Sequence, residues 1–204
     1  MPQRAYGYGG QAETFAARHS MDSPEWYTPQ PIVEAAREVM GGIDLDPASH
    51  AEANERIQAT TFYNEVMDGL TLPWSGRVFL NPPGGKDKNG KPLVPQFWAQ
   101  LVEWFFHGDV TQVIWIGYSL EQLQTLQNQT KVTPLDFSMC VPRKRIAFIE
   151  NEAKKAARIT KQIAAGKSPT KGDQPSHGNY ITYMGIKKGA FAQVFEPFGH
   201  VVLR

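Results

Sequence analysis

The stretch Val78-Phe79-Leu80-Asn81-Pro82-Pro83-Gly84-Gly85 decides the fold expected for this chain. Its first three residues are apolar and favour a β-strand, and the Pro-Pro-Gly-Gly sequence ends that strand in a tight loop. Asn81 then stands at the carboxyl end of a buried strand, which is where open α/β sheets bind their ligands.

The loop after this strand is stiff and rich in hydrogen-bond acceptors. Pro82 and Pro83 have a fixed φ angle and no backbone N–H. The loop therefore offers mostly acceptors, namely the Asn81 side-chain oxygen and the nearby carbonyls. Such acceptors can hold the exocyclic amino group of a base and draw its protons out of the ring plane, which frees the nitrogen lone pair for nucleophilic attack. A proline-rich turn with a capping asparagine is the alternative interpretation.

The composition bounds the class of protein. A chain of 204 residues that is 41% hydrophobic has enough apolar material for the core of one globular domain. We expect no membrane span and no secretory signal, because no apolar run is long enough and no basic-then-apolar start occurs. The single cysteine, Cys140, excludes an internal disulfide and a thiolate metal cluster, so we expect a cytoplasmic protein without a metal site.

The charges are segregated along the chain. Between residues 143 and 171, nine basic residues accompany two acidic ones, a net charge of +7, whereas the rest of the chain has a net charge of −6. Such a segment suits the phosphate backbone of a nucleic acid. A solvated lysine-rich helix is the alternative. Residues 1–22 lack a clear period and are expected to form a flexible arm, which leaves 23–204 as the predicted single domain.

Strands and helices alternate through the first 130 residues, which predicts a mostly parallel sheet flanked by helices, with an antiparallel edge formed by the last two strands. Ser49 is expected to cap a helix that ends near Gln58, with Glu52 as its capping-box partner. The other expected helices cover 32–40, 120–127 and 150–165, and one more begins at 95. Strands are expected at 43–46, 78–80, 113–117, 135–140, 146–149, 180–186 and 200–203.

The segment Ile43-Asp44-Leu45-Asp46-Pro47-Ala48-Ser49 carries two acids from a strand toward the start of a helix. Carboxylates there suit a ligand with hydroxyl or ammonium donors and repel a phosphate group. A glycine-rich phosphate loop is also missing, so the segment is not a dinucleotide-binding fingerprint.

Five short segments follow one another along the chain: Trp26-Tyr27-Thr28-Pro29, Asp44-Leu45-Asp46-Pro47-Ala48-Ser49, Asp68-Gly69-Leu70 with Trp74, Asn81-Pro82-Pro83, and Arg145-Ile146-Ala147-Phe148. Their order and spacing resemble those of the phage DNA N6-adenine methyltransferase family, over about 60% of the chain. The resemblance implies a Rossmann-like class I methyltransferase fold, S-adenosylmethionine as cofactor, and double-stranded DNA as substrate.

The resemblance also implies roles for individual residues. Asn81, Pro82 and Pro83 match the catalytic motif. Positions that match cofactor-binding ones are Thr28 at the methionine end, Asp44, Asp46 and Ala48 in the segment where an acid meets the ammonium group, and Asp68 at the adenine amino group. A helix cap is the alternative for Thr28, and a plain strand end for Asp46. The cations expected to bind DNA are Lys86, Lys88, Arg143, Lys144, Arg145, Lys154, Lys155 and Arg158.

One position departs from the family pattern. The motif normally ends in Tyr or Phe, whose ring stacks on the extruded base, and this chain has Gly84 there. Stacking contributes roughly 1–3 kcal/mol per base, so base capture needs another ring; Phe97 and Trp98 are candidates, although core packing is the stronger interpretation of both. Alternatively, Gly84-Gly85 lets the backbone approach the base closely. Otherwise the chain is a DNA-binding relative without turnover. A small-molecule amino-methyltransferase is the third possibility, which would leave the basic segment unexplained.

Overall fold

The structure, a computed structural model, describes residues 26–168 and 178–204, without the side chains of Ala153 and Lys154. The expected N-terminal arm and the last residues of the basic segment lie outside the described residues. The strands are β1 (Trp26–Tyr27), β2 (Leu45–Asp46), β3 (Thr61–Phe62), β4 (Gly76–Leu80), β5 (Val110–Gly117), β6 (Ser138–Pro142), β7 (Ile149–Glu150), β8 (Tyr180–Met184) and β9 (Gly199–Val202).

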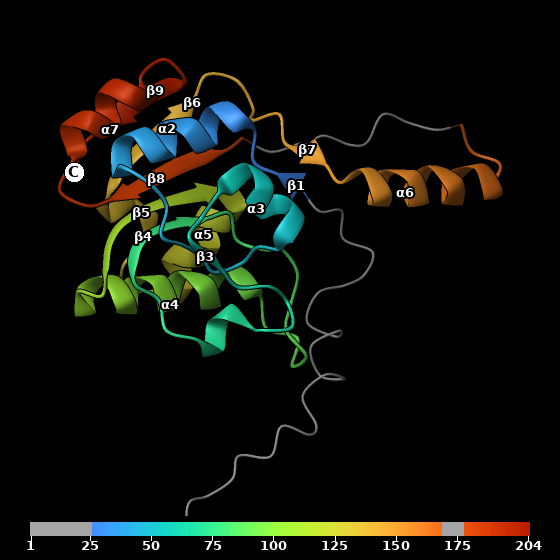
Figure 1. Ribbon diagram of the computed structural model, residues 1–204, viewed down its shortest axis with the longest axis horizontal. Coiled ribbons are helices and arrows are strands. Elements are labelled where there is room, and N and C mark those ends of the chain that lie inside the picture. Colours follow the sequence, from blue (N-terminus) through green and yellow to red (C-terminus); the bar gives the residue numbers. More distant parts are fainter. Residues whose placement is uncertain (1–25, 169–177) are drawn as a thin grey trace, which may run out of the picture.

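Helices connect most of these strands. The α-helices are α2 (Gln30–Met40), α3 (Ala51–Ile57), α4 (Leu93–His107), α5 (Leu120–Gln129), α6 (Glu152–Ala164) and α7 (Lys188–Phe195), and short 3-10 helices form η1 (Gly69–Thr71) and η2 (Pro134–Asp136). In Figure 1, α6 projects away from the rest of the molecule beyond the small β1–β7 ribbon.

The main sheet has seven strands in the order β3-β2-β4-β5-β8-β6-β9. The first four are parallel, β8 is antiparallel to both β5 and β6, and β9 is antiparallel to β6. This confirms the prediction of an α/β fold with a mostly parallel core and an antiparallel edge, and it is compatible with a Rossmann-like arrangement. The edge itself differs from the prediction, because β6 lies between β8 and β9.

Helices cover both faces of the sheet (Figure 1). On one face, α2, α3 and α7 pack on residues such as Phe79 and Ile114, and on the other face α4 and α5 pack on Leu80 and Trp115. Neighbouring residues of β4 and β5 therefore point to opposite sides of the sheet, as strand geometry requires. Both faces being covered explains why these strands are continuous apolar runs.

Three local predictions were wrong. His50, not Ser49, caps α3, because its Nδ1 accepts a hydrogen bond from the Ala53 N–H at 3.5 Å, while the Ser49 N–H is bonded to the Tyr63 carbonyl at 2.9 Å and stays in the loop. In the expected strand 146–149 only Ile149 is in a strand, β7. The expected strand 135–140 begins at Ser138, after the turn of η2.

Candidate active site

The carboxyl ends of β2 and β4 lie side by side where the chain changes direction in the sheet. From β2 the chain continues to β3 on one side, and from β4 to β5 on the other. Open α/β sheets bind ligands at such a switch point, in the crevice outside the carboxyl ends of the strands. Asp46 ends β2 and Asn81 directly follows β4, so both predicted site residues lie at this edge.

The Asn81 side chain has a defined orientation. Its Nδ2 donates a hydrogen bond to the Trp26 carbonyl at 3.3 Å, and because a carbonyl only accepts, the Oδ1 is turned away from that contact. No described residue donates a hydrogen bond to this Oδ1. Asn81 is partly exposed, and Pro82 beside it is buried. The strand end thus presents one uncommitted acceptor on a rigid support.

Asp46 is an ionisable group deep in the fold, with only 2% of its surface exposed. Its Oδ1 accepts a hydrogen bond from the Ala48 N–H at 3.2 Å. Burial raises the pKa of Asp46 to about 7, because removal from water disfavours the charged form, and the Ala48 N–H and the nearby Ser49 hydroxyl oppose this rise only in part. A buried carboxyl that titrates near neutral pH is a functional-site candidate.

Two buried hydroxyl groups accompany this carboxyl. Thr28 Oγ1 has no hydrogen-bond partner within the described part of the chain, and Ser49 Oγ lies near the Asp46 carboxyl without a well-formed hydrogen bond to it. Unpaired buried hydroxyls are uncommon in folded proteins, because a polar group loses its water without replacement. A ligand with its own donors and acceptors would satisfy them.

Strand β1 brings Thr28 to this edge. The Trp26 carbonyl contacts Asn81, as described above, and the Tyr27 ring lies 5.5 Å from the ring of His50, which follows Ser49. Thr28 is the next residue and is 3% exposed. The structure therefore brings Thr28 together with the segments that follow β2 and β4.

The loop with Asp68 packs against the segment after β2. Gly69 lies so close to Pro47 that a Cβ atom added at this glycine would stand 2.0 Å from the Pro47 carbonyl oxygen, so only glycine fits. The Trp74 Nε1 donates to the Gly69 carbonyl at 2.7 Å and holds the turn. Asp68 is buried beside it, in a left-handed conformation with φ +54, and its Oδ1 accepts from the Leu70 N–H at 3.3 Å.

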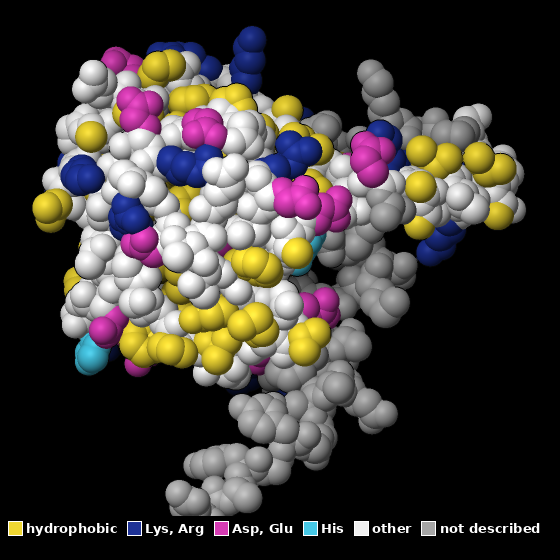
Figure 2. Space-filling model, viewed as in Figure 1, with side chains coloured by type: hydrophobic (Ala, Val, Ile, Leu, Met, Phe, Trp, Pro, Cys, Tyr) yellow, Lys and Arg dark blue, Asp and Glu magenta, His cyan; other side chains and the backbone are white. Residues whose placement is uncertain are grey.

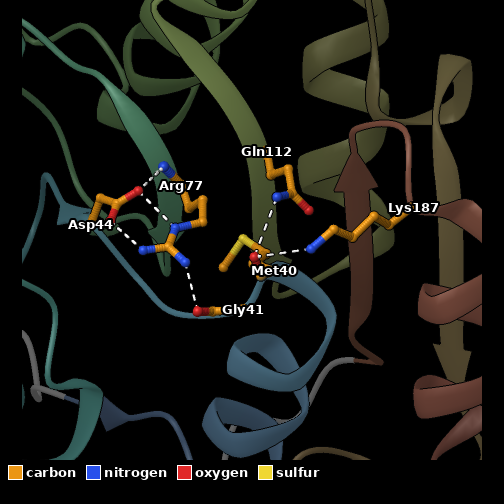
Figure 3. Close-up of polar contacts among 6 residues, drawn as sticks. All are labelled: Met40, Gly41, Asp44, Arg77, Gln112 and Lys187. Atoms are coloured by element: carbon orange, nitrogen blue, oxygen red, sulfur yellow. Dashed lines mark hydrogen bonds and ion pairs between the residues drawn. The ribbon is translucent and has the colours of Figure 1, made fainter.

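Asp44 lies at the opposite end of the sheet and is not part of the candidate site. Its carboxylate accepts hydrogen bonds from the Arg77 N–H and Nε at 2.8 Å each and from Nη2 at 2.5 Å (Figure 3). Arg77 also donates to the Gly41 carbonyl at 2.6 Å, at the end of α2. The Arg77 guanidinium lowers the pKa of Asp44 below its ordinary value. Asp44 therefore stabilises the fold at the amino ends of the strands.

Lys86 and Lys88 are exposed on a small hairpin that follows the Asn-Pro-Pro loop, closed by a bridge between Lys86 and Pro92. The Asp87 carboxylate braces the hairpin, because its Oδ1 accepts from the N–H groups of Asn89 at 2.8 Å and Lys91 at 2.9 Å. The loop after Pro83 is therefore held in a defined hairpin. Lys86 and Lys88 follow Asn81 by only five and seven residues in the sequence.

The remaining predicted DNA-binding residues divide into two groups. Arg143, Lys144 and Arg145 are exposed, and Arg143 Nη1 donates to the Glu196 carbonyl at 2.9 Å. On α6, two cations form ion pairs: Arg158 with Glu150 at 2.9 Å, and Lys155 with Glu152 at 3.1 Å. The Lys154 side chain lies outside the described part. On the face seen in Figure 2, charges of both signs mix over the body, and α6 displays apolar side chains.

The structure excludes both candidates for the missing aromatic ring and agrees with the stronger interpretation, that they are core residues. Phe97 and Trp98 are 4% and 0% exposed and pack inside the core, Phe97 against Trp74 and Trp98 against Trp115, so neither ring can stack on a base. Gly84 is exposed, and a Cβ added there would meet nothing within 4 Å.

Sequence reasoning missed two contributors to the site. Ser49 was interpreted as a helix cap, although its place directly after the Asp-Pro-Ala segment was a signal for the site. Trp26 contributes its backbone carbonyl to Asn81, and a backbone contact of this kind leaves no signature in the sequence.

No family model, curated protein or solved structure matches this chain. Within residues 26–168 and 178–204, no helix has the length and apolar character to span a membrane. The same residues contain no group of three or more His, Cys, Asp and Glu side chains placed to hold a metal ion.

Proposed function

We propose that this protein transfers a methyl group from S-adenosylmethionine to N6 of adenine in double-stranded DNA. The observation that carries the proposal is the orientation of Asn81, whose Nδ2 is committed to the Trp26 carbonyl while its Oδ1 remains an uncommitted acceptor at the switch point of the sheet. An amino group of a base is a donor that such an acceptor can hold.

The chain's own residues would perform the polar part of this chemistry. Asn81 Oδ1 and a carbonyl of the Pro82-Pro83 turn accept hydrogen bonds from the two amino protons, which turns the nitrogen lone pair out of conjugation with the ring. When bound, S-adenosylmethionine supplies an electrophilic methyl group on a sulfonium centre. The nitrogen would bond to the methyl carbon as the carbon–sulfur bond breaks, so that the sulfur would leave as a neutral thioether and one amino proton would pass to solvent.

The polar groups around β2 fit the cofactor. Thr28 and Ser49 contribute buried hydroxyls without well-formed hydrogen bonds in the described part of the chain. Asp46, once ionised, would pair with the ammonium group of the methionine portion, and that pairing offsets the cost of its burial. Asp68 precedes Gly69, which packs against Pro47, and in this proposal it would bind the adenine amino group of the cofactor.

The exposed cations support DNA as the substrate. The braced hairpin with Lys86 and Lys88 follows the Asn-Pro-Pro loop, and Lys144 and Arg145 lie exposed in the segment before β7. On α6 the ion pairs with Glu150 and Glu152 reduce the charge available to phosphates. We therefore assign more of the phosphate binding to the hairpin and to residues 143–145 than the sequence suggested.

A second candidate function is DNA binding without turnover. The exposed Gly84, combined with the burial of Phe97 and Trp98, favours it, because no ring of the motif is available to stack on an extruded base. A small-molecule amino-methyltransferase would need no such ring either, but it would leave the exposed basic residues without a role.

Calorimetry separates these functions. S-adenosylmethionine and an unmodified DNA duplex are titrated separately into the full chain, and the cofactor is then titrated into the protein–duplex mixture. Binding of both supports the proposed function. Binding of the duplex alone supports the second candidate, and binding of the cofactor alone supports a small-molecule substrate. Absence of cofactor binding would contradict the proposal.

A further inference from the structure

The β1–β7 ribbon connects α6 to the candidate site. It is a two-stranded antiparallel sheet in which Trp26 pairs with Glu150 and Tyr27 with Ile149. The Trp26 carbonyl holds the Asn81 amide, and Thr28 follows the strand with its buried hydroxyl. Among the described strands, β1 pairs only with β7. The position of these site groups therefore depends on what holds β1 and β7.

Asn151, the residue directly before α6, holds this ribbon to the body. It is 5% exposed, and its Nδ2 donates to the Tyr27 hydroxyl and, at 2.9 Å, to Glu52 Oε2 on α3. An amide nitrogen carries two protons, so these two bonds use both of its donors. One side chain thus ties together α3, β1 and the start of α6.

The ribbon is also fixed to α6 itself. Arg158 forms two parallel hydrogen bonds with Glu150, from Nε at 2.9 Å and from Nη2 at 3.0 Å. Such a bidentate pair sets direction as well as distance. The orientation of α6 is therefore coupled to β7, and through the pairing with Trp26 to the strand that contacts Asn81.

We propose that Asn151 is a positioning residue: through the Tyr27 hydroxyl it holds β1 so that the Trp26 carbonyl orients Asn81 for methyl transfer. This inference rests on the proposed function. Asn151 touches neither cofactor nor base, and its effect passes through β1. Because a displacement of about 1 Å at a reacting group can reduce a rate about 100-fold, loss of this contact reduces kcat rather than substrate affinity.

A side chain that only stabilises the fold would behave differently, and Asn54 provides such a comparison. The Asn54 side chain bonds the Ala59 backbone in both directions, at 2.9 Å and 3.2 Å, and closes the end of α3. Replacing Asn54 by Ala should lower the melting temperature while kcat stays unchanged. Asn151→Ala should lower kcat beyond any change in stability.

The test is a double-mutant cycle on methyl transfer to duplex DNA, using Tyr27→Phe, Asn151→Ala and the double variant of the full chain. Tyr27→Phe removes only a hydroxyl, so the fold is kept. We expect each single change to lower kcat about 10-fold or more, with KM for duplex and cofactor within about threefold, and the double variant to be no slower than the slower single variant.

Two outcomes overturn the positioning role: single variants whose kcat stays within twofold of wild type, or losses that multiply in the double variant. The wild-type rate is measured first. If wild type binds duplex and cofactor but transfers no methyl group, the proposed function itself fails, whereas wild-type turnover with unaffected variants overturns only the role of Asn151.

Discussion

Asp44 and Asp46 flank one residue of the same short strand, yet their surroundings are opposite. Asp44 lies at the amino end of β2, where the Arg77 guanidinium and backbone N–H lower its pKa (Figure 3). Asp46 lies at the carboxyl end, where burial raises its pKa to about 7, and the Ala48 N–H and the nearby Ser49 hydroxyl oppose this rise only in part.

The two ends of the sheet differ in the same way. At the amino end, the Met40 carbonyl accepts hydrogen bonds from Gln112 Nε2 at 3.3 Å and from Lys187 Nζ at 3.4 Å. The carbonyl at the end of α2 therefore has two hydrogen-bond donors. At the carboxyl end, two buried hydroxyls and the Asn81 oxygen have no well-formed partner in the described part of the chain. Buried polar groups without partners at the carboxyl end are consistent with the proposed ligand site there, although Trp115, Asn179 and Thr182 also carry such groups elsewhere in the described part of the chain.

The largest effect is expected for Asn81→Ala. Removing the uncommitted acceptor should reduce methyl transfer to duplex DNA about 100-fold, by analogy with the loss of one transition-state hydrogen bond, while cofactor affinity changes less than tenfold. Gln112→Ala is the control, because it also removes an amide side chain but at the amino end of the sheet. This variant should have lower stability and unchanged turnover. Retention of more than a tenth of wild-type turnover by Asn81→Ala would remove Asn81 from the chemistry.

The two aspartates provide the next contrast. Asp46→Asn should weaken cofactor binding about tenfold, because hydrogen bonds to a charged group contribute about 1.5–3 kcal/mol, and Asp44→Asn should leave it unchanged. Stability should move in opposite directions at pH 8. Asp44→Asn should destabilise by about 1 kcal/mol, since its ion pair is partly exposed, and Asp46→Asn should stabilise by about 2–4 kcal/mol by removing a buried charge. Calorimetry measures the cofactor affinity, and thermal unfolding measures the stability. The same change in affinity and in stability for both variants would show that the two aspartates do not have different roles.

The pH dependence follows from the pKa of Asp46. In the unliganded protein this pKa, about 7, lies above the ordinary value of 3.8. The stability contributed by the neutral acid is therefore present below pH 3.8 and is lost as the pH rises through 7. The proposed contact with the cofactor ammonium group needs the carboxylate, so cofactor affinity should fall up to about tenfold per pH unit below pH 7. Asp46→Asn should abolish this dependence in calorimetric titrations, and a wild-type affinity that is flat between pH 5.5 and 8 would argue against an Asp46–ammonium contact.

The smallest effect is expected at Gly84. Since a side chain there meets no neighbour, Gly84→Tyr should fold normally and return a stacking ring to the motif. Stacking on an extruded base contributes roughly 1–3 kcal/mol. We expect the new ring to provide part of this energy, so the KM of Gly84→Tyr for duplex DNA should be about fivefold lower than that of wild type. Steady-state kinetics with duplex DNA test this, with Gly189→Tyr on α7 as the exposed control, since a side chain there also meets no neighbour. An unchanged KM would show that base capture does not use this position.

Much of the fold could be predicted because local signals and burial agreed. The apolar run at Val78–Leu80 and the proline break after it fixed a central strand and the place of Asn81. The sequence could not show that Asp44 and Asp46 have different roles, because Asp44 pairs with Arg77, which is 33 residues away in the chain. For Phe97 and Trp98 the sequence favoured the core, which the structure confirms, but it could not exclude a ligand pocket, because an apolar helix stripe of aromatic residues occurs in both.

The most direct test of the account is incubation of the full chain with methyl-labelled S-adenosylmethionine and unmodified duplex DNA, followed by digestion and nucleoside analysis. We expect label in N6-methyladenine for wild type and for Gln112→Ala at the amino end, and about 100-fold less label for Asn81→Ala at the carboxyl end. Absence of labelled nucleoside from wild type that binds both cofactor and duplex would contradict it, as would equal labelling by Asn81→Ala.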